Sequence, residues 1–402
     1  MKIIGIVAEY NPFHTGHAYQ IVQSRLALGS DTGVVAVMSG NWVQQAHCAI
    51  ADKWTRARLA LMGGADLVLD LPTLWATASA EGFARGAVSL LHGSGVVDTL
   101  SFGSELGEVA PLRLVAEGLN RPEYRDRLAV HLNGGLSFPA ARQKAMEDLL
   151  GEDAALLSTP NNNLGIEYLR ALNRLGSHIT PMTVRRQGAA HNTISTDAPA
   201  FVSATHIRHN LTAGTPEDIR AYLGMAGAEL LLDGGVQLAS LHRAERAILA
   251  KLRSMTASDW AKLPDSGQAE GLPQRLEKAG QQCTSVAHFL ELTKTKRYTH
   301  ARLRRLVLWA YLGLQADHIP ATPPYLRVLG FNRRGQDILK AMKQNATLPI
   351  LTKPAHARTL DEPGRTLFEQ EARFTDLYDL CLDDIPVPGR EWTQGPVLLL
   401  ED

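Results

Sequence analysis

Two histidines in the stretch HTGH, His14 and His17, are three residues apart and follow the apolar run IIGIV and the segment AEYNPF. At positions i and i+3 of a helix they would share one face, so both imidazoles could reach the same ligand. A helix that begins near Thr15 would also aim its free backbone N–H groups and its positive dipole end at an anion. Imidazole N–H groups can donate to phosphate oxygens and stabilise the charge that builds up during transfer at the α-phosphorus of a nucleotide. These residues therefore indicate a phosphate site.

Two other interpretations fit the same histidines. One is an ordinary turn with one capping histidine and one surface histidine. The other is half of a zinc site, although no cysteine or carboxylate nearby completes a convincing ligand set. We expect no tightly bound protein metal.

The elements that would position this segment alternate between short apolar runs and longer helical stretches along the first half of the chain. This pattern is typical of βαβ units and a parallel sheet. We expect strands at 2–7, 33–38, 66–71, 99–102 and 178–184, and helices at 17–28, 50–62 and 76–91. Ligands of such sheets gather at the carboxyl ends of the strands, and the histidines follow the first strand at such an end.

The length of 402 residues favours two domains. We expect an α/β domain with a parallel sheet over residues 1–215, with a helical insertion at about 106–157, and a mainly helical domain over 216–402. Helices of the second domain are expected at 224–232, 239–254, 285–291 and 299–312. After the prolines at 320, 323 and 324 we expect a strand or turn leading into a helix within 325–343, then an extended arm over 384–402.

The composition is that of a water-soluble protein without a global pull toward nucleic acid, because 41 lysines and arginines balance 41 aspartates and glutamates. A basic patch on one domain is still allowed. Cys48, Cys283 and Cys381 are too few and too far apart for a disulfide framework or a CxxC metal site, so we expect a cytoplasmic protein. No apolar run reaches the length of a signal-peptide core or a membrane span, so we expect no membrane association.

The stretch HTGH at 14–17 resembles the HxGH signature of the nucleotidylyltransferase superfamily, which shares its Rossmann-like fold with class I aminoacyl-tRNA synthetases. Over nearly the whole chain the sequence more closely resembles the tRNA(Met) cytidine acetate ligase family. The matching segments, in chain order, are GIVAEYNPFHTGH (5–17), VMSGNWVQ (37–44), DKWTRARLAL (52–61), GADLVLDLP (64–72), SFGSE (101–105), PNNNLGIEYL (160–169), SATHIR (203–208) and YLRVLGFNRRG (325–335).

The resemblance implies an enzyme that uses ATP to activate acetate as acetyl-adenylate and then acetylates N4 of the wobble cytidine in elongator tRNA(Met). It implies a Rossmann-like ATP-binding catalytic domain over 1–215, a helical tRNA-binding domain over 216–402, and Mg²⁺ bound with ATP. His14 and His17 would be the catalytic residues, and Ser203, Thr205 and Arg208 would meet the β- and γ-phosphates. The residues implied to bind ATP are Val7, Ala8, Glu9, Tyr10, Asn11, Pro12, Phe13, His14, Thr15, Gly16, His17, Ala18, Tyr19, Gln20, Gly103, Asn162, Arg186, Gln187, Ser203, Thr205 and Arg208.

Several of these residues also fit structural roles. From the residues alone, Gly103 fits a plain turn and Asn162 fits a helix cap. Ser203 fits an N-cap followed by an exposed Arg208, and Arg186 fits a solvated rim. Only their combination with HTGH favours the nucleotide.

One loop departs from the family's pattern. Where the family usually reads QRGEPA, this chain reads QQAHCA at 44–49, with Gln45 and His47 in place of an arginine and a glutamate. If the loop shapes the acetate pocket or holds tRNA, the change affects acyl choice, rate or RNA affinity.

Binding of tRNA requires a positive surface that meets backbone phosphates. Our hypothesis for this surface takes basic residues from three segments, and the alternative is a solvated face on each. The residues are Lys53, Arg56, Arg297, Arg302, Arg304, Arg305, Arg333 and Arg334.

Two other functions remain open on the sequence. The chain could be another adenylyl- or cytidylyltransferase that acts on a small metabolite, against which the basic helical region argues. It could also be a noncatalytic RNA-binding protein with a relic nucleotide site, against which the presence of both His14 and His17 argues. The sequence indicates no oligomeric state.

Overall fold

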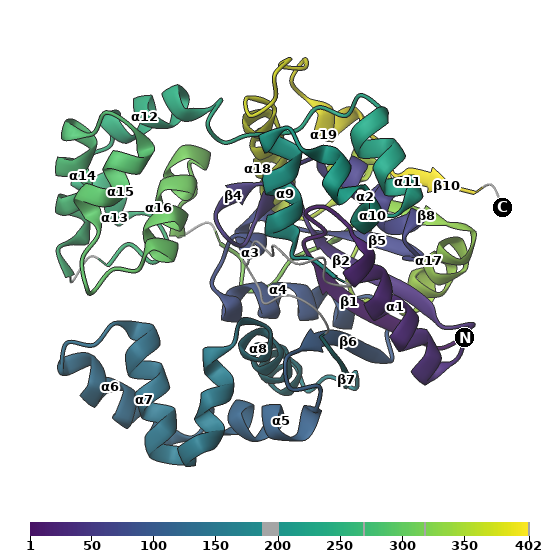
Figure 1. Cartoon of the computed structure of the whole chain (residues 1–402), viewed down its shortest axis with the longest axis horizontal. Helices are drawn as coiled ribbons and strands as arrows, with labels where there is room; N and C mark the ends of the chain where they lie inside the picture. The colour runs from purple at the N-terminus through teal and green to yellow at the C-terminus, as the bar shows by residue number, and fades with distance from the viewer. Residues whose placement is uncertain (187–200, 268–269, 317–318, 401–402) are drawn as a thin grey trace.

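The computed structural model describes residues 1–186, 201–267, 270–316 and 319–400, and Figure 1 shows a central sheet with helices on both faces and two helical extensions to one side. The sheet has the strand order β10-β8-β5-β2-β1-β6-β7, and β9 pairs with β8. Its strands are β1 (Ile3–Ala8), β2 (Gly33–Ser39), β5 (Leu67–Leu71), β6 (Thr99–Ser104), β7 (Thr180–Arg185), β8 (Leu326–Asn332), β9 (Ile350–Leu351) and β10 (Val397–Leu399).

The sheet is mostly parallel, as the sequence predicts. All five predicted strands are present, and β1 pairs in parallel with both β2 and β6. The chain winds from β1 through β2 to β5 and then returns to the other side of β1 as β6. In open α/β sheets, ligands bind in the crevice where the winding reverses, outside the carboxyl ends of the strands. The crevice between β1 and β6 is therefore the expected ligand position.

The central strands are apolar on both faces because helices cover both. Along β2, Val35 and Val37 join one buried cluster while Val34 and Ala36 join the other, as alternation across a sheet requires. One face is covered by α1 (Thr15–Leu28) and α2 (Lys53–Met62), and the other by α3 (Thr73–Ala76), α4 (Ala80–Gly93) and α8 (Pro160–Arg174).

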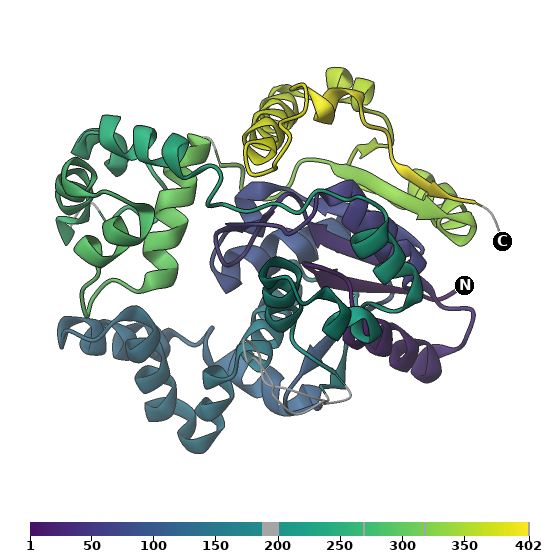
Figure 2. The ribbon, with the colours of Figure 1, turned by 45° about the horizontal axis from the view of Figure 1, so that its top comes forward.

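The predicted insertion is helical. It consists of α5 (Val109–Gly118), α6 (Pro122–Asn133), α7 (Phe138–Leu150) and the 3-10 helix η1 (Gly151–Ser158). In Figures 1 and 2, α6 and α7 extend from the sheet on the same side as the second helical extension.

The second helical extension is formed by α12 to α16, which we call the helical lobe. It comprises α12 (Glu245–Ser254), α13 (Ala257–Ala261), α14 (Leu272–Gln282), α15 (Val286–Thr293) and α16 (His300–Leu312). Before it, the chain forms α9 (Ala204–Ala213), η2 (Pro216–Ile219), α10 (Arg220–Leu223), α11 (Met225–Ala228) and the π-helical turn η3 (Glu229–Asp233). The lobe is attached to the sheet through the short hairpin β3 (Trp42–Val43) and β4 (His47–Cys48), where the rings of Trp42 and Tyr311 lie 6.1 Å apart.

The predicted boundary at residue 215 does not separate the sheet from the rest of the chain. The strand β8 pairs antiparallel with β5, and β10 pairs with β8. The run from Leu326 to Gly330 is buried without alternation, so it needs cover on both faces, and only a sheet interior supplies this. The remaining elements of this region are α17 (Arg333–Asn345), η6 (Pro354–Thr359), α18 (Glu362–Asp379) and α19 (Arg390–Thr393).

Across the described residues, every helix is too short or too polar to cross a membrane.

Candidate nucleotide site at the carboxyl ends of the parallel strands

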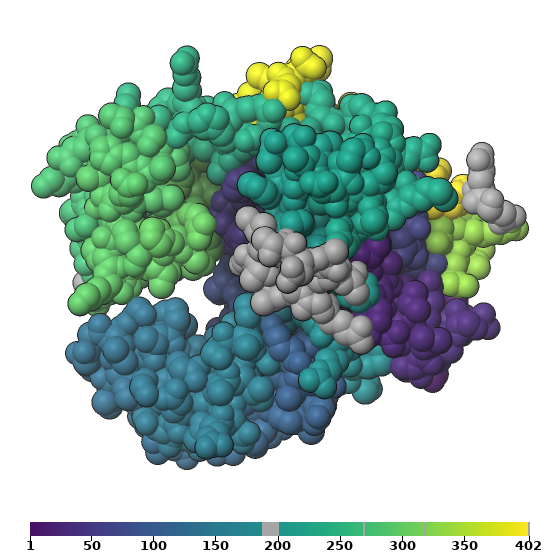
Figure 3. All heavy atoms as spheres, in the orientation of Figure 1, coloured from purple at the N-terminus to yellow at the C-terminus, as the bar shows by residue number. Residues whose placement is uncertain are grey.

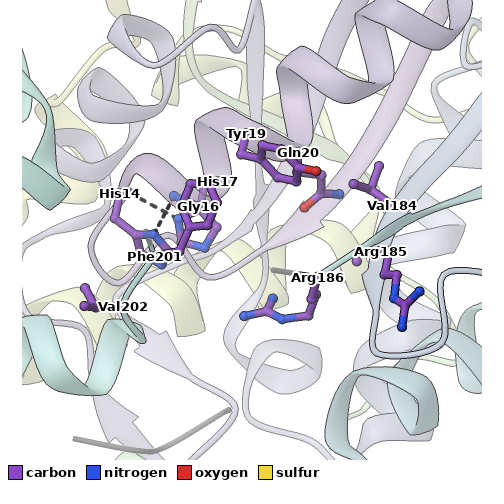
Figure 4. Close-up of a pocket in the computed structure, with 11 residues that line it drawn as sticks. His14, Gly16, His17, Tyr19, Gln20, Val184, Arg185, Arg186, Phe201 and Val202 are labelled. Carbon is purple, nitrogen blue, oxygen red and sulfur yellow. Dashed lines mark hydrogen bonds between the residues drawn. The ribbon is translucent and has the colours of Figure 1, made fainter. Parts of the chain in front are cut away.

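A pocket opens beside the amino end of α1, at the carboxyl ends of β1, β6 and β7 (Figure 4). This is the crevice where the winding of the sheet reverses. The residues that line it are His14, Gly16, His17, Tyr19, Gln20, Gly103, Val184, Arg185, Arg186, Phe201 and Val202.

The helix α1 begins at Thr15, as predicted, and both histidines take part in its cap. The backbone N–H of Gly16 donates to Nδ1 of His14 at 3.0 Å, and the backbone N–H of His14 donates to Nδ1 of His17 at 3.2 Å. Because each Nδ1 accepts a hydrogen bond, each neutral ring carries its proton on Nε2. The pair therefore differs from a turn with one capping and one surface histidine, because both rings are fixed as Nε2–H donors.

Both imidazoles are held in the neutral state. Burial, together with the smaller effect of the positive charges of Arg186 and Arg208, lowers the pKa of His14 to about 3. Burial, followed by His14 and Arg186, lowers the pKa of His17 well below its usual value. Near neutral pH the pair therefore offers hydrogen-bond donors without a full positive charge.

Aromatic rings hold His17 in place. The ring of Tyr10 meets that of His17 edge-on at a centroid distance of 4.8 Å, and the ring of Phe13 lies 5.5 Å away. Tyr10 has a φ of 44°, in the left-handed region that bulky residues avoid at a cost of roughly 1–3 kcal/mol. The loop thus accepts backbone strain at the residue whose ring supports His17.

A glycine is required at position 16 because the ring of His14 lies directly beside it. A Cβ atom at this position would lie 2.8 Å from Cε1 and 3.0 Å from Nδ1 of His14. Real Cβ atoms do not approach ring atoms this closely, so a larger residue would displace the imidazole. Gly16 therefore leaves room for the His14 ring beside the backbone.

Two arginines border the histidines from other elements. Figure 4 shows the Arg186 side chain reaching toward the histidines from the end of β7, while Arg185 points away. A Cβ atom at Gly103 would lie 3.2 Å from Cγ of Arg186, so this glycine leaves room for that side chain. From α9, Arg208 donates through Nη1 to the backbone oxygen of Asn11 at 2.8 Å and through Nη2 to Oγ1 of Thr205 at 3.1 Å.

The SATHIR segment reaches the histidine loop through the hydrogen bond from Arg208 to the backbone oxygen of Asn11. Ser203 caps α9, because its hydroxyl accepts the N–H of His206 at 3.2 Å. The cap was one of the alternatives for this serine, and in the structure it coexists with closeness to the site. Gln187 lies outside the described residues.

Asn162 is committed to the scaffold. Its Oδ1 accepts the N–H of Leu106 at 3.2 Å, and its Nδ2 donates to Oγ1 of Thr159 at 2.7 Å. The residue is buried at the start of α8 and is absent from the pocket lining among the described residues. The side chain does not cap α8, whose N-cap is Thr159 without a side-chain cap hydrogen bond, so the capping alternative is wrong for Asn162, and its contacts hold it away from the pocket.

The predicted RNA contacts of Lys53 and Arg56 are wrong, because both side chains are buried, with exposed fractions of 1% and 0%. Lys53 Nζ lies 2.6 Å from Oδ2 of Asp70 and 2.7 Å from Oε2 of Glu391. Arg56 donates to the backbone oxygens of Glu9, Ser39, Gly40 and Ala51. Neither cation can meet a phosphate at the surface.

The other predicted RNA contacts lie in two separate places. On α16, Arg302 and Arg305 pair with Asp265, whereas Arg304 is exposed and Arg297, just before the helix, is 64% exposed. Arg333 and Arg334 follow β8, which runs antiparallel to β5, so they lie at the opposite edge of the sheet from the histidines. One surface that includes all of these arginines is therefore excluded.

Phe201 and Val202 line the pocket but were missed by the sequence reasoning. The ring of Phe201 lies 5.1 Å from that of Tyr19, so it continues the wall formed by α1. Two apolar residues in a loop carry no chemical signal of their own. The signal that could have predicted them is their position directly before SATHIR.

A family model described as HIGH Nucleotidyl Transferase matches residues 1–388. A tRNA(Met) cytidine acetate ligase from Caldanaerobacter subterraneus is 37% identical over 396 residues, which cover 96% of this chain and 97% of the relative. One from Alkaliphilus metalliredigens is 39% identical over 410 residues, which cover 95% of each chain.

Solved structures agree with these sequence relatives. The crystal structure of Thermotoga maritima TmcAL without ligand matches with a TM-score of 0.94 and 33% identity, and covers 100% of both chains. The form bound with alpha-thio ATP matches with a TM-score of 0.91 and 32% identity, again over 100% of both chains. The chain therefore belongs to the tRNA(Met) cytidine acetate ligase family within the HIGH nucleotidyl transferases.

Proposed function

We propose that this protein is an ATP-dependent ligase that activates acetate as acetyl-adenylate and acetylates N4 of the wobble cytidine of elongator tRNA(Met). The observation that carries the proposal is the pair of neutral imidazoles at the amino end of α1, each with its proton on Nε2. The names of the relatives and the ATP analogue bound to the Thermotoga maritima protein support the same activity.

In the first step, ATP lies with its phosphates at the amino end of α1. His14 and His17 donate their Nε2–H groups to oxygens of the α-phosphate, while Arg186 adds positive charge. Arg208 lies beside the β- and γ-phosphates together with Ser203 and Thr205. A carboxylate oxygen of acetate attacks the α-phosphorus and pyrophosphate leaves. No protein nucleophile is required, because the site positions the reactants and stabilises charge.

Mg²⁺ enters with ATP in this proposal. The side chains around the phosphates are histidines and arginines, which donate hydrogen bonds and suit phosphate oxygens better than a cation. Within the described residues, no group of three or more His, Cys, Asp and Glu could hold a metal ion. Bound through ATP, Mg²⁺ would offset the charge of the departing pyrophosphate.

For tRNA we propose two exposed basic residues, Arg297 just before α16 and Arg304 on α16, as contacts to backbone phosphates. Figure 3 shows the surface hollowed between the helical lobe and the α6–α7 segment. The anticodon arm would enter this hollow and present an unstacked cytidine to the acetyl-adenylate. A cytoplasmic location follows from these substrates.

The test is incubation of the protein with ATP, acetate and elongator tRNA(Met), followed by nucleoside analysis and measurement of pyrophosphate. We expect N4-acetylcytidine and acetate-dependent pyrophosphate release. Pyrophosphate release with another acceptor but not with acetate would overturn the proposal in favour of a different nucleotidylyltransferase. Binding of tRNA without any turnover of ATP would overturn it in favour of an RNA-binding protein.

A further inference from the structure

The second half of the proposed reaction needs a proton acceptor, and the two histidines cannot supply it. The N4 amino group of cytidine loses a proton as it attacks the acetyl carbon. In His14 and His17 the basic atom Nδ1 already accepts a backbone N–H, at 3.0 Å and 3.2 Å. The other ring nitrogen carries a proton, and burial disfavours a second proton on either ring. The base must be another group.

Two carboxylates stand at the carboxyl ends of the strands that border the site, Glu105 after β6 and Glu9 after β1. The carboxylate oxygens of Glu105 accept hydrogen bonds from the start of α8. It accepts the backbone N–H groups of Asn161 and Asn162 at 3.1 Å and 2.7 Å, and Nδ2 of Asn161 at 2.7 Å. Although burial acts in the opposite direction, these hydrogen bonds lower the pKa of Glu105 and make it a poor base.

Glu9 is positioned differently. Its Oε1 accepts the backbone N–H of Gln44 at 2.8 Å, and its backbone oxygen accepts from Arg56 at 2.6 Å, so the residue is fixed at both ends. The side chain is partly buried. Burial raises its pKa above the usual value near 4.5, against the lowering effects of the Gln44 N–H, Arg208 and Arg56. A carboxylate in such surroundings gains proton affinity, which a general base requires.

Glu9 also lies on the side from which an RNA base must come. The pocket that suits the nucleotide extends from the histidines toward β6 and β7, and its lining does not include Glu9. Glu9 instead contacts the loop of the β3–β4 hairpin through Gln44. That hairpin packs on α16 through Trp42 and Tyr311, and the exposed arginines proposed to meet tRNA lie on α16 and just before it.

We propose that Glu9 is the general base for the transfer of the acetyl group to cytidine, an inference that rests on the function proposed above. N4 of cytidine forms a bond to the acetyl carbon, and the bond from this carbon to the oxygen of AMP breaks. The proton of N4 passes to the carboxylate of Glu9, and AMP leaves with the electron pair of the broken bond. Solvent then takes the proton from Glu9 and restores the carboxylate.

The experiment measures the two half-reactions separately in the wild type and in Glu9→Gln. Acetate-dependent exchange of pyrophosphate into ATP reports adenylate formation, and single-turnover transfer to elongator tRNA(Met) reports the second step. Glutamine keeps an oxygen for the Gln44 N–H but cannot take a proton. We expect the transfer rate of Glu9→Gln to fall about 100-fold or more, and far more than its adenylation rate. Glu117→Gln, at an exposed position on α5, is the matched control and should transfer as the wild type does.

The pH profile of the transfer rate, compared between the wild type and Glu9→Gln, gives a second test. The groups that face Glu9 are Arg56 from α2, Arg208 from α9, Tyr168 from α8 and the Gln44 amide. The arginines and the tyrosine keep one charge state between pH 5 and 8. In the β3–β4 hairpin, the pKa of His47 is raised above 6.5 and that of Cys48 is lowered to about 6, so the comparison with Glu9→Gln isolates the contribution of Glu9. We expect the wild-type rate to fall about tenfold per pH unit below the raised pKa of Glu9, and the Glu9→Gln rate to be flat.

The outcomes separate this inference from the proposed function. If the wild type forms acetylcytidine and Glu9→Gln transfers equally fast, Glu9 is not the base and the function stands. If Glu9→Gln slows both half-reactions equally, or the wild-type transfer rate is flat with pH, the inference is also overturned. If the wild type forms no acetylcytidine, the proposed function fails and the inference falls with it.

Discussion

The imidazole rings of His14 and His17 lie 3.8 Å apart between centroids, and the backbone N–H of His14 donates to the ring of His17. Each histidine therefore fixes the other as well as the helix that follows. Because the cap uses Nδ1 and the proposed phosphate contacts use Nε2 of the same ring, the two roles can be separated by substitution.

We predict that His14→Asn and His14→Ala both lose acetate-dependent pyrophosphate exchange by at least about 100-fold, because neither keeps the Nε2–H donor. Asparagine is a good N-cap and alanine is not, so His14→Ala should unfold about 1 kcal/mol more easily than His14→Asn. Urea denaturation and the exchange assay check the two effects. Full activity in either variant would show that His14 only caps the helix and has no role in catalysis.

We predict that the free energy of unfolding decreases as the pH is lowered, because His14 binds a proton more readily in the unfolded chain. Its pKa is about 3 in the folded protein and near 6.5 when unfolded, so between these values the unfolded chain binds more protons. The resulting contribution is present above pH 6.5 and is lost as the pH falls. From pH 7 to pH 5 the free energy of unfolding should fall by about 2 kcal/mol more in the wild type than in His14→Asn, which has no titrating ring at position 14. Parallel urea titrations at the two pH values measure this difference, and identical losses would contradict it.

We predict that Gly16→Ala impairs catalysis by moving His14, because the new Cβ would lie 2.8 Å from the ring. Pyrophosphate exchange should fall about tenfold or more, as a displacement of a catalytic group by about 1 Å can cost 100-fold. The control is Gly395→Ala, just before β10, where the backbone φ is not positive and no atom lies within 4 Å of a new Cβ. Wild-type pyrophosphate exchange in Gly16→Ala would show that the His14 ring can shift without loss of activity.

Lys53→Met should destabilise the protein without acting through RNA. The substitution leaves Asp70 and Glu391 buried with one partner fewer, which typically costs about 3–5 kcal/mol. Lys340→Met breaks a pair with Asp337 that is 74% and 65% exposed, and should cost less than about 1 kcal/mol. Urea unfolding of the two variants tests the contrast. Equal stabilities would mean that the buried cluster relaxes around methionine.

For tRNA, Arg304→Glu should weaken binding and reduce its salt dependence, because an exposed phosphate contact becomes a repulsion. Arg333→Glu makes the same charge change at the opposite edge of the sheet and should bind as the wild type does. Filter binding at several salt concentrations gives both slopes. If the two variants behave alike, α16 is not the contact surface.

The sequence predicted the parallel strands and the start of α1 because apolar runs and caps are local signals. It did not predict that Lys53 is buried, because its partner Glu391 is far away along the chain and a lysine on an amphipathic helix resembles a solvated one. The role of β8 was missed for a similar reason. A short apolar run shows that a strand is present, but not which sheet receives it.

In the candidate site, too, the sequence predicted what depends on local signals and missed what depends on contacts in the fold. HTGH indicated both histidines and their helix, since type, spacing and position are all local. The commitment of Asn162 to Leu106 and Thr159, and the packing of His14 over Gly16, depend on side-chain directions that no spacing encodes. The tautomer of each ring likewise follows only from the backbone N–H groups that it meets.

The place of β8 also sets the order in which the enzyme can be completed on the ribosome. The strand β5 (Leu67–Leu71) emerges long before its neighbour β8 (Leu326–Asn332), and at typical elongation rates the interval is on the order of tens of seconds. During this time the outer edge of β5 presents unpaired backbone groups to any other strand nearby. Nascent chains that stall before residue 326 therefore hold the histidine loop while β5 is still an unpaired edge strand, which makes them prone to aggregation.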